Sequence, residues 1–402
     1  MHLAIVSPYP PTITGIGQYG YHVSRLLEQS GVFRQITVLT DSSKNPDQLE
    51  KPSSLQIERA WLPNQWNTGW NIRNKLIQLN PDLVWFNLGA SVFGRSPLAN
   101  LSGYFGPTWA RQLNIPTIVT MHELVQLADL RTLEAPGGPF ATWGARLLTH
   151  IGLQADVVCL TMRHYADWLA TRQPNLPCVH IPIGAYHTPE LLSENESNTR
   201  ELLFFTTLAP YKGVELLLHA FSQLKAEYPD LHLTIAGSEH ARFLGYAHRL
   251  HEQFNSLKDV RWLGQVPEDQ VRELFRNAEI VALPYNASTG SSSVLYQAAL
   301  WGRSLVASNL AEMQAVVCES GLDVTYFERG NAASLAKALK TQLDSPSLRR
   351  QQIQHNFSAI QHYSPEETLR AYLHAFNLAF ETQSGTKRIV IPATLLTASE
   401  TR

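Results

Sequence analysis

The sequence is poor in cysteine and in charged residues. Only three of its 402 residues are cysteines, and charged side chains make up 16% of the chain. Cys159, Cys178 and Cys318 lie far apart, without the short spacings of metal sites, so we expect reduced thiols in a cytoplasmic protein that holds no metal. The net charge of −2 excludes the strongly basic character of general nucleic-acid-binding proteins.

Long apolar runs are also absent. No stretch approaches the roughly 20 apolar residues of a membrane-spanning helix. The apolar start at His2–Ser7 is too short for a signal peptide, so we expect it to form the first strand. The length of 402 residues fits two domains of ordinary size, each with its own core.

The stretch 280–308 is the most informative part of the chain. Ile280–Leu283 is a short apolar run, typical of a strand buried in a parallel sheet, and Pro284 predicts its end. A small, polar loop then leads through Gly290–Ser292 into a predicted helix. Because the first turn of a helix has free N–H groups and a partial positive charge, this loop predicts a site for an anion such as phosphate. An ordinary serine-capped helix is the alternative interpretation.

The second half of the chain repeats this alternation of strand and helix. Apolar runs end just before Lys212, Gly237, Gly264 and Gly290, and helical patterns separate them. Such an alternation predicts a parallel α/β sheet, in which ligands lie outside the carboxyl ends of the strands. We therefore expect these four residues to converge on one crevice at one edge of the sheet.

The first half of the chain predicts another parallel sheet. A loop from Pro8 to Gly17 and a helix from Gln18 to Gln29 should follow its first strand. Gly15 and Gly17 lack a third glycine outside this helix, which disfavours a nicotinamide-dependent dehydrogenase. The expected strands are Leu3–Ser7, Ile36–Thr40, Leu83–Asn87, Thr117–His122, Val157–Thr161 and Val179–Ile183.

His122 stands at the carboxyl end of one of these strands. Active sites of open α/β sheets gather at such ends, so His122 is a candidate site residue. A histidine in this place can also simply hydrogen-bond a neighbouring loop, and its position alone leaves that alternative open.

Taken in order, these motifs resemble the family-4 retaining glycosyltransferases, which have the two-domain GT-B fold. The resemblance covers roughly residues 1–382. It implies an α/β fold of two Rossmann-like domains facing across a cleft, with the C-terminal helix crossing back to the first domain. The motifs are Pro10–Gly17, Thr120–Glu123, Leu208–Gly213, Ile235–Gly237, Leu263–Pro267 and Gly290–Ser292.

The resemblance and the local composition together predict the domain boundaries. Ser364, followed by Pro365 and two glutamates, is typical of a helix start. We expect an acceptor-side domain in residues 1–187, a polar linker in 188–200, a nucleotide-sugar donor domain in 201–362, a crossover helix in 363–383 and a tail in 384–402.

The implied activity is transfer of a sugar from a nucleotide-diphosphate sugar to an acceptor hydroxyl with retention, in polysaccharide or glycoconjugate synthesis. The family needs no divalent metal and no cofactor, and its acceptors include sugars and lipid-linked molecules. Its motifs carry catalytic roles onto His122 and Lys212 of this sequence. Donor-binding roles fall on Gly15, Gly17, Gly237, Gly264, Val266, Thr289, Gly290, Ser291, Ser292 and Gln297.

The sequence departs from the family's pattern at three positions, which makes it an atypical member. Thr207 stands where the family usually has an arginine, five positions before Lys212. Thr289 and Gln297 replace the usual pair of glutamates, so the donor stays unassigned. Two alternatives therefore remain: a non-catalytic relative that binds a nucleotide or a partner, and an epimerase or phosphorylase of similar architecture.

Three tryptophans near the start of the chain suggest a further contact. Trp61, Trp66 and Trp70, followed by Arg73 and Lys75, can be interpreted as touching a membrane surface or a lipid-linked acceptor, at the inner face of the membrane. Packing in the core is the alternative for these tryptophans.

Overall fold

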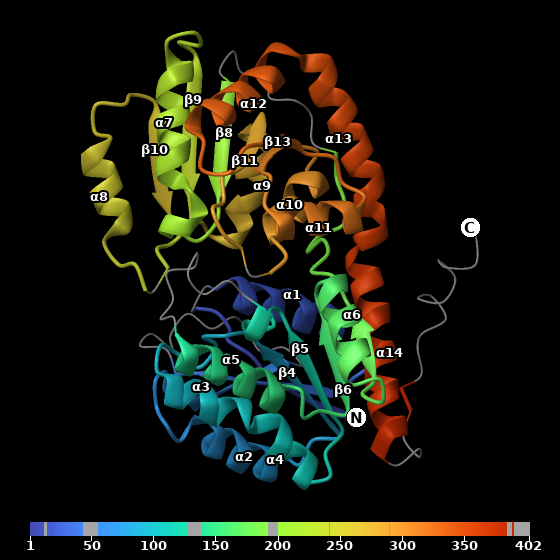
Figure 1. The fold of residues 1–402 in the computed structure, drawn as a ribbon. Coiled ribbons are helices and arrows are strands. Elements are labelled where there is room, and N and C mark those ends of the chain that lie inside the picture. Colours follow the sequence, from blue (N-terminus) through green and yellow to red (C-terminus); the bar gives the residue numbers. More distant parts are fainter. Residues whose placement is uncertain are drawn as a thin grey trace. The chain divides into compact units, whose positions relative to one another are not determined.

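The computed structural model describes residues 1–11, 14–42, 55–127, 138–191, 200–240, 242–288, 290–383 and 388–389. They form two compact α/β units (Figure 1). The first unit holds the described chain up to Ile183 together with the last helix, and the second unit holds the described part of Gly184–Ser364.

A parallel sheet forms the centre of the first unit. Strands β1, β4, β5 and β6 are buried almost throughout, because helices cover both faces of the sheet. The spatial order of the strands is β3-β2-β1-β4-β5-β6-β7. In the described residues they are β1 (His2–Val6), β2 (Gln35–Asp41), β3 (Leu55–Trp61), β4 (Leu83–Leu88), β5 (Thr117–Met121), β6 (Val157–Leu160) and β7 (Cys178–His180).

The first helix begins earlier than the sequence predicts. Thr14 is its N-cap, and Thr14 Oγ1 accepts a hydrogen bond of 2.9 Å from Gly17 N. The helix α1 therefore runs over Gly15–Gln29, and the predicted loop up to Gly17 is wrong. The helices that follow in this unit are α2 (Thr68–Leu79), α3 (Pro97–Tyr104), α4 (Gly106–Gln112), η2 (Val125–Leu127), α5 (Pro139–Gly152) and α6 (Arg163–Arg172).

The last helix, α14 (Pro365–Gln383), packs on the first unit against α1, β5 and β6. Its Tyr372 is fully buried, and Tyr372 Oη lies 2.9 Å from Tyr19 Oη on α1 and 2.8 Å from Thr120 Oγ1 on β5. The expected return of the C-terminal helix to the first domain is therefore confirmed.

A second parallel sheet forms the centre of the second unit, in the order β10-β9-β8-β11-β12-β13. Every residue of β11 and β12 is buried. The strands of this sheet in the described residues are β8 (Arg200–Phe205), β9 (Leu231–Ala236), β10 (Val260–Gly264), β11 (Ile280–Leu283), β12 (Ser304–Ser308) and β13 (Thr325–Phe327).

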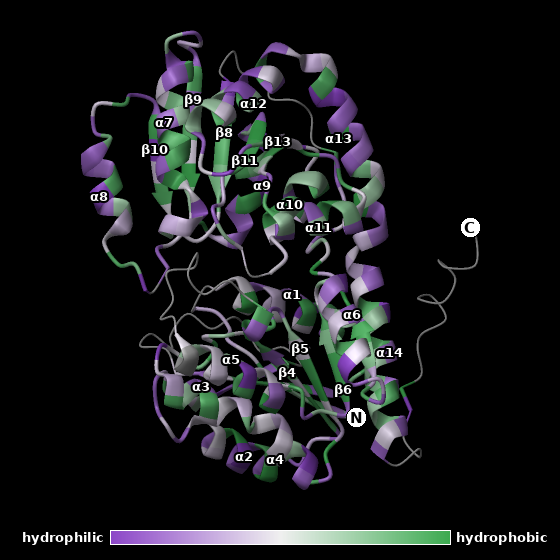
Figure 2. Cartoon of the chain, viewed as in Figure 1, coloured by the Kyte–Doolittle hydropathy of each residue, from purple (hydrophilic) through white to green (hydrophobic). Residues whose placement is uncertain are grey.

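Helices surround this second sheet, and Figure 2 shows its strands mainly in hydrophobic colours and the outer helices α8 and α13 largely in hydrophilic ones. An apolar sheet covered by amphipathic helices gives the unit its own core. The helices of the described part are η3 (Pro210–Lys212), α7 (Val214–Lys225), α8 (Tyr246–Gln253), α9 (Glu268–Asn277), α10 (Ser293–Leu300), α11 (Ala311–Ser320), α12 (Ala332–Asp344), α13 (Pro346–Ile360) and η4 (Gln361–Tyr363).

Both sheets have the same doubly wound topology. In each, the chain adds two strands on one side of its first strand and then continues on the other side, so β1 neighbours β4 and β8 neighbours β11. Ligands of such sheets bind at this switch point, outside the carboxyl ends of the strands. The predicted fold class of two Rossmann-like α/β domains is confirmed. A ligand site is therefore expected at the loops that follow β1, β4, β8 and β11.

Candidate functional site

The loop after β11 leads into the N-terminus of α10 at the carboxyl edge of the second sheet. Ser292 is the N-cap residue, but its side chain makes no capping hydrogen bond with the described residues. Ser292 Oγ instead lies 3.3 Å from Tyr285 Oη. The N-cap side chain therefore satisfies none of the first-turn N–H groups of α10, although Leu295 N donates 3.1 Å to Ser292 O. A helix N-terminus of this kind favours an anion.

Lys212 lies in the loop after β8, which packs against the end of β11. A Cβ on the next residue, Gly213, would lie 1.8 Å from Pro284 O, and the φ of Gly213 is 74°, so this close approach requires glycine. Lys212 Nζ lies 3.9 Å from the centre of the Tyr285 ring, a cation–π contact. Tyr285 thus contacts both Lys212 and Ser292, and these three residues are called the Lys212 cluster below.

The loops after β9 and β10 meet the end of β8 at the same edge of the sheet. Gly237 N donates a hydrogen bond of 2.7 Å to Gly264 O. A Cβ on Gly237 would lie 1.9 Å from Thr206 O, at a φ of 142°, so a side chain cannot be accommodated there. Val266 follows, half-buried, two residues after Gly264. The structure therefore brings Gly237 and Gly264 together beside the strand that precedes Lys212.

Gln297 occupies the second turn of α10, with 9% of its surface exposed. The residues around it, Val294–Leu300, are buried as well, so packing helps to set its orientation. Before the helix, Ser288 Oγ donates 2.9 Å to Gly290 O, and Ser291 is half-buried. Thr289, which stands at the other glutamate position of the family, lies outside the described residues.

In the first unit, His122 directly follows β5 and is only 8% exposed. Burial lowers the pKa of its imidazole to about 3, so the ring is neutral at physiological pH. His122 Nε2 lies 2.7 Å from Asn87 Oδ1, and the ring packs edge-on against Tyr19 with the ring centres 4.8 Å apart. His122 therefore stands at the predicted sheet edge, and its ring hydrogen-bonds Asn87 on the neighbouring strand β4 rather than a loop.

The two glycines assigned to the donor lie in the first turn of α1. Gly15 is exposed, and no described atom lies within 4 Å of the place where its Cβ would be. Gly17 is buried, and its N–H already donates to Thr14 Oγ1. The N–H group of Gly17 is therefore used in capping the helix and is not free to bind a donor.

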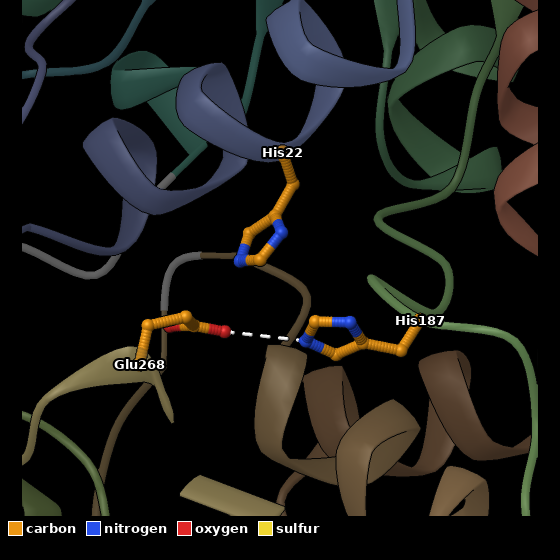
Figure 3. A group of neighbouring side chains, drawn as sticks. All are labelled: His22, His187 and Glu268. Atoms are coloured by element: carbon orange, nitrogen blue, oxygen red, sulfur yellow. Dashed lines mark hydrogen bonds and ion pairs between the residues drawn. The ribbon is translucent and has the colours of Figure 1, made fainter. Parts of the chain in front are cut away.

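The segment that follows the first unit packs on the second. Glu190 pairs with Arg272, with Nε donating 3.1 Å to Oε2. His187 Nε2 lies 3.3 Å from Glu268 Oε1 at the start of α9 (Figure 3). The predicted linker at 188–200 thus begins as part of the second unit, and its middle lies outside the described residues.

The tryptophans of the first unit divide into two kinds. Trp61 is 2% exposed on β3, so the core interpretation is correct for it. Trp66 and Trp70 are 72% and 54% exposed, and the Arg73 guanidinium lies 5.2 Å from the centre of the Trp70 ring. Lys75 forms an ion pair within the same unit. None of the helices in the described part is both long and apolar enough to pass through a membrane.

Sequence reasoning misses two residues that the structure places in these sites, Asn87 and Tyr285. Asn87 interrupts an apolar strand beside the switch point, and a buried polar group needs partners, so its position is a usable signal. Tyr285 follows the proline that ends β11, and nothing in the sequence distinguishes it from an ordinary core aromatic.

A comparison with known protein families finds a match to part of this chain. Residues 192–358 match a family model described as "Glycosyl transferases group 1". The matched range includes the Lys212 cluster and the whole of α10.

Curated relatives agree with that match. The phosphatidyl-myo-inositol mannosyltransferase of Propionibacterium freudenreichii is 30% identical over 138 residues, which are 34% of this chain and 33% of that protein. The glycogen synthase of Mycobacterium tuberculosis is 22% identical over 372 residues, which are 86% of this chain and 87% of that protein. The chain matches only about a third of the length of the mannosyltransferases.

Solved structures share the fold. Anabaena HepE in complex with UDP-glucose has a TM-score of 0.70 at 16% identity, covering 92% of this chain and 97% of that one. Sucrose-phosphate synthase from Thermosynechococcus elongatus has a TM-score of 0.72 at 16% identity, covering 94% and 99%. The family model matches less than half of the chain, and the likeness to the solved structures shows that the fold is that of GT-B glycosyltransferases.

Proposed function

We propose that this chain is a retaining hexosyltransferase that moves a sugar from a nucleotide-diphosphate sugar to an acceptor hydroxyl. The observation that carries the proposal is the Lys212 cluster at the N-terminus of α10, beside the switch point of the second sheet. An ammonium group and the positive N-terminal end of a helix suit the negative charge that develops on a leaving diphosphate. The UDP-glucose held by Anabaena HepE supports a nucleotide sugar as the donor.

The proposed reaction uses neither a divalent metal nor a cofactor, because the nucleotide sugar is itself a substrate. Some transferases neutralise the diphosphate with a metal ion. In this chain Lys212 and the first turn of α10 would supply that positive charge. Turnover should then persist in excess chelator, and a complete loss that magnesium or manganese restores would contradict this part of the proposal.

In the first unit, His122 is the proposed contact for the donor sugar. Its pKa of about 3 keeps the imidazole neutral, so it can form hydrogen bonds with sugar hydroxyls but cannot act as an acid near pH 7. Gln297 takes the ribose side in place of a glutamate. A neutral amide accepts hydroxyl hydrogen bonds less strongly than a carboxylate does, so we expect a weaker grip on the ribose than in members that have the glutamate.

The proposed acceptor is a sugar or a lipid-linked molecule, in polysaccharide or glycoconjugate synthesis at the cytoplasmic face of the membrane. The exposed Trp66 and Trp70 beside Arg73 support a peripheral membrane contact. Sedimentation with vesicles that contain anionic lipid tests this membrane contact. Wild type should pellet with the vesicles, and a Trp66→Ala/Trp70→Ala variant should stay in the supernatant. Leu244→Ala, which removes a side chain that is 65% exposed in the second unit, is the matched control.

The deciding experiment is transfer and hydrolysis with a panel of radiolabelled nucleotide sugars. Wild type should turn over at least one donor, Lys212→Ala should lose most of that turnover, and Lys258→Ala, which removes an exposed lysine of the same unit, should match wild type. NMR of the product's anomeric proton then distinguishes retention from inversion. Equal turnover by all three proteins would exclude the Lys212 cluster as the diphosphate site.

A non-catalytic, nucleotide-binding relative is the second candidate. Thr207 and Gln297, which replace an arginine and a glutamate of the family pattern, favour it because they remove charges from the donor side. This candidate predicts binding of a nucleotide diphosphate that depends on Lys212, without transfer or hydrolysis of any donor in the panel.

A further inference from the structure

A chain of hydrogen bonds at the carboxyl edge of the first sheet has a defined direction. Asn87 is fully buried on β4, and Asn87 Nδ2 lies 2.9 Å from Ile16 O and 2.9 Å from Ser7 Oγ. A backbone carbonyl can only accept, so the atom facing Ile16 is the amide nitrogen. Ser7 Oγ donates 2.8 Å to Pro8 O, which leaves its oxygen to accept from Asn87. Two carbonyls therefore determine the orientation of the Asn87 amide.

The oxygen of the same amide faces His122. Asn87 Oδ1 can only accept, and it lies 2.7 Å from His122 Nε2, so the proton of the ring is on Nε2. Burial is the sole cause of the lowered pKa of about 3, so the ring carries one proton at neutral pH and Nδ1 carries none. Within the described chain, His122 Nδ1 has no hydrogen-bond partner. The ring therefore retains one unused nitrogen, which is an acceptor.

The plane of the ring is held from a second side. Tyr19 packs edge-on against His122 at an angle of 83° between the ring planes. Tyr19 Oη lies 2.9 Å from Tyr372 Oη, so the last helix supports this contact. A flip of the imidazole would exchange its nitrogen and carbon atoms and break the bond to Asn87, so the position of Nδ1 follows from its neighbours.

We propose that Asn87 is a positioning residue of the sugar site: it holds His122 as the tautomer protonated on Nε2, so that Nδ1 accepts a hydrogen bond from a hydroxyl of the bound sugar. This inference rests on the proposed function. It assigns His122 the role of acceptor for a sugar hydroxyl and excludes it as a proton donor to the leaving group or to the sugar.

The tautomer can be measured directly in the wild-type protein. ¹⁵N-histidine labelling and NMR distinguish Nε2–H from Nδ1–H imidazole, and a spectrum of His122→Gln identifies the signals of His122. We expect a protonated Nε2 and a bare Nδ1 that do not titrate between pH 5 and pH 8, because the pKa of His122 is about 3. A proton on Nδ1, or titration near pH 6.5, would overturn the proposal, and neither result depends on any enzymatic activity.

The positioning role is tested by Asn87→Asp. Its carboxylate should raise the pKa of the adjacent ring, so that Nδ1 becomes protonated and loses its acceptor capacity at low pH. We expect kcat/KM to fall about tenfold per pH unit below the new pKa and to recover above it. The double variant Asn87→Asp/His122→Gln has no ring to titrate and should lack this recovery. A pH profile of Asn87→Asp identical to that of wild type would contradict the positioning role, and the wild-type spectrum decides the tautomer even where the variant does not fold.

Deoxyfluoro donors test the contact with the sugar. A C–F group cannot donate, so replacing the hydroxyl that faces Nδ1 should lower kcat/KM of the wild type by about three- to tenfold. The same replacement should cost His122→Gln less than wild type, because only the inductive effect of the fluorine on the reacting sugar remains. Equal losses in both proteins at every hydroxyl would refute the contact. If no nucleotide sugar is turned over, the proposed function fails and the sugar contact fails with it, while the NMR result on Asn87 and His122 stands by itself.

Discussion

Replacing His122 by glutamine should remove the share of the pH dependence of stability between pH 7 and pH 5 that a buried, neutral histidine gives the first unit. In the folded protein, burial lowers the pKa of His122 to about 3. An unfolded histidine has a pKa of about 6.5, so between these two values the unfolded state binds a proton that the folded state does not. Falling pH therefore favours unfolding from about pH 6.5 downward, until the folded state is protonated as well near pH 3.

The size of this effect follows from the same two pKa values. Between pH 7 and pH 5 the free energy of unfolding should fall by about 2 kcal/mol through His122 alone. His122→Gln keeps an N–H donor for Asn87 Oδ1 but has no titrating ring, so this share of the loss disappears. The pKa of His2 is lowered by burial and that of Asp156 is raised by burial, but both groups are present in both proteins and cancel in the comparison.

Amide hydrogen exchange provides a measurement that is local to the first unit. Peptides that cover β4 and β5, corrected for the intrinsic exchange rate at each pH, report the free energy of opening next to His122. Between pH 7 and pH 5 this free energy of opening should fall by about 2 kcal/mol more in wild type than in His122→Gln. Losses that agree within about 0.5 kcal/mol would refute the neutral, buried ring.

Three further predictions concern the second unit. Lys212→Ala should weaken binding of a nucleotide diphosphate by about 1.5–3 kcal/mol with an unchanged melting temperature, and calorimetry that finds wild-type affinity would exclude the phosphate contact. Tyr285→Leu removes the ring beneath Lys212 and should weaken the same binding by about 0.5–2 kcal/mol, whereas Tyr285→Phe keeps the ring and should bind nearly as wild type; equal losses would assign the effect to the hydroxyl. Gln297→Leu should weaken nucleotide binding by leaving ribose hydroxyls unpaired. If it binds fully while Gln297→Glu melts early because of a buried charge, Gln297 is a core residue.

The end of β11 and both ends of α10 could be predicted from the sequence because their signals are local. Pro284 cannot donate a ladder hydrogen bond, and the strand ends directly before it. Just past the C-terminal end of α10, Gly302 adopts a φ of 61°. Gly302 N then donates 3.2 Å to Ala299 O, and Arg303 N donates 2.8 Å to Ala298 O, the pair of bonds that commonly ends a helix at glycine. Each signal acts within five residues, so a single sequence contains it.

The start of α1 and the strand β3 could not be predicted in the same way. Thr14 begins the helix from within a stretch of prolines and glycines that is typical of a loop. Leu55–Trp61 contains Glu58 and Arg59, which hide its apolar alternation, and it becomes a strand at the edge of the sheet through parallel pairing with β2. Trp61 is buried as a consequence of that pairing, which is why its role could not be read from its neighbours in the chain.

The chemistry of His122 could not be predicted from its motif. Thr120–Glu123 predicts that a histidine stands at a sheet edge, and the structure bears this out, but the motif is equally compatible with a ring that donates and a ring that accepts. The difference is set by Asn87, 35 residues earlier in the chain, and by the carbonyl of Ile16, 71 residues before Asn87, which turns the amide oxygen toward the ring. Were a hydrogen-bond donor to stand in place of Asn87 Oδ1, the same histidine would carry its proton on Nδ1 and present a donor to the sugar. The residue type therefore locates the site, and the direction of the surrounding hydrogen bonds determines what the site can recognise.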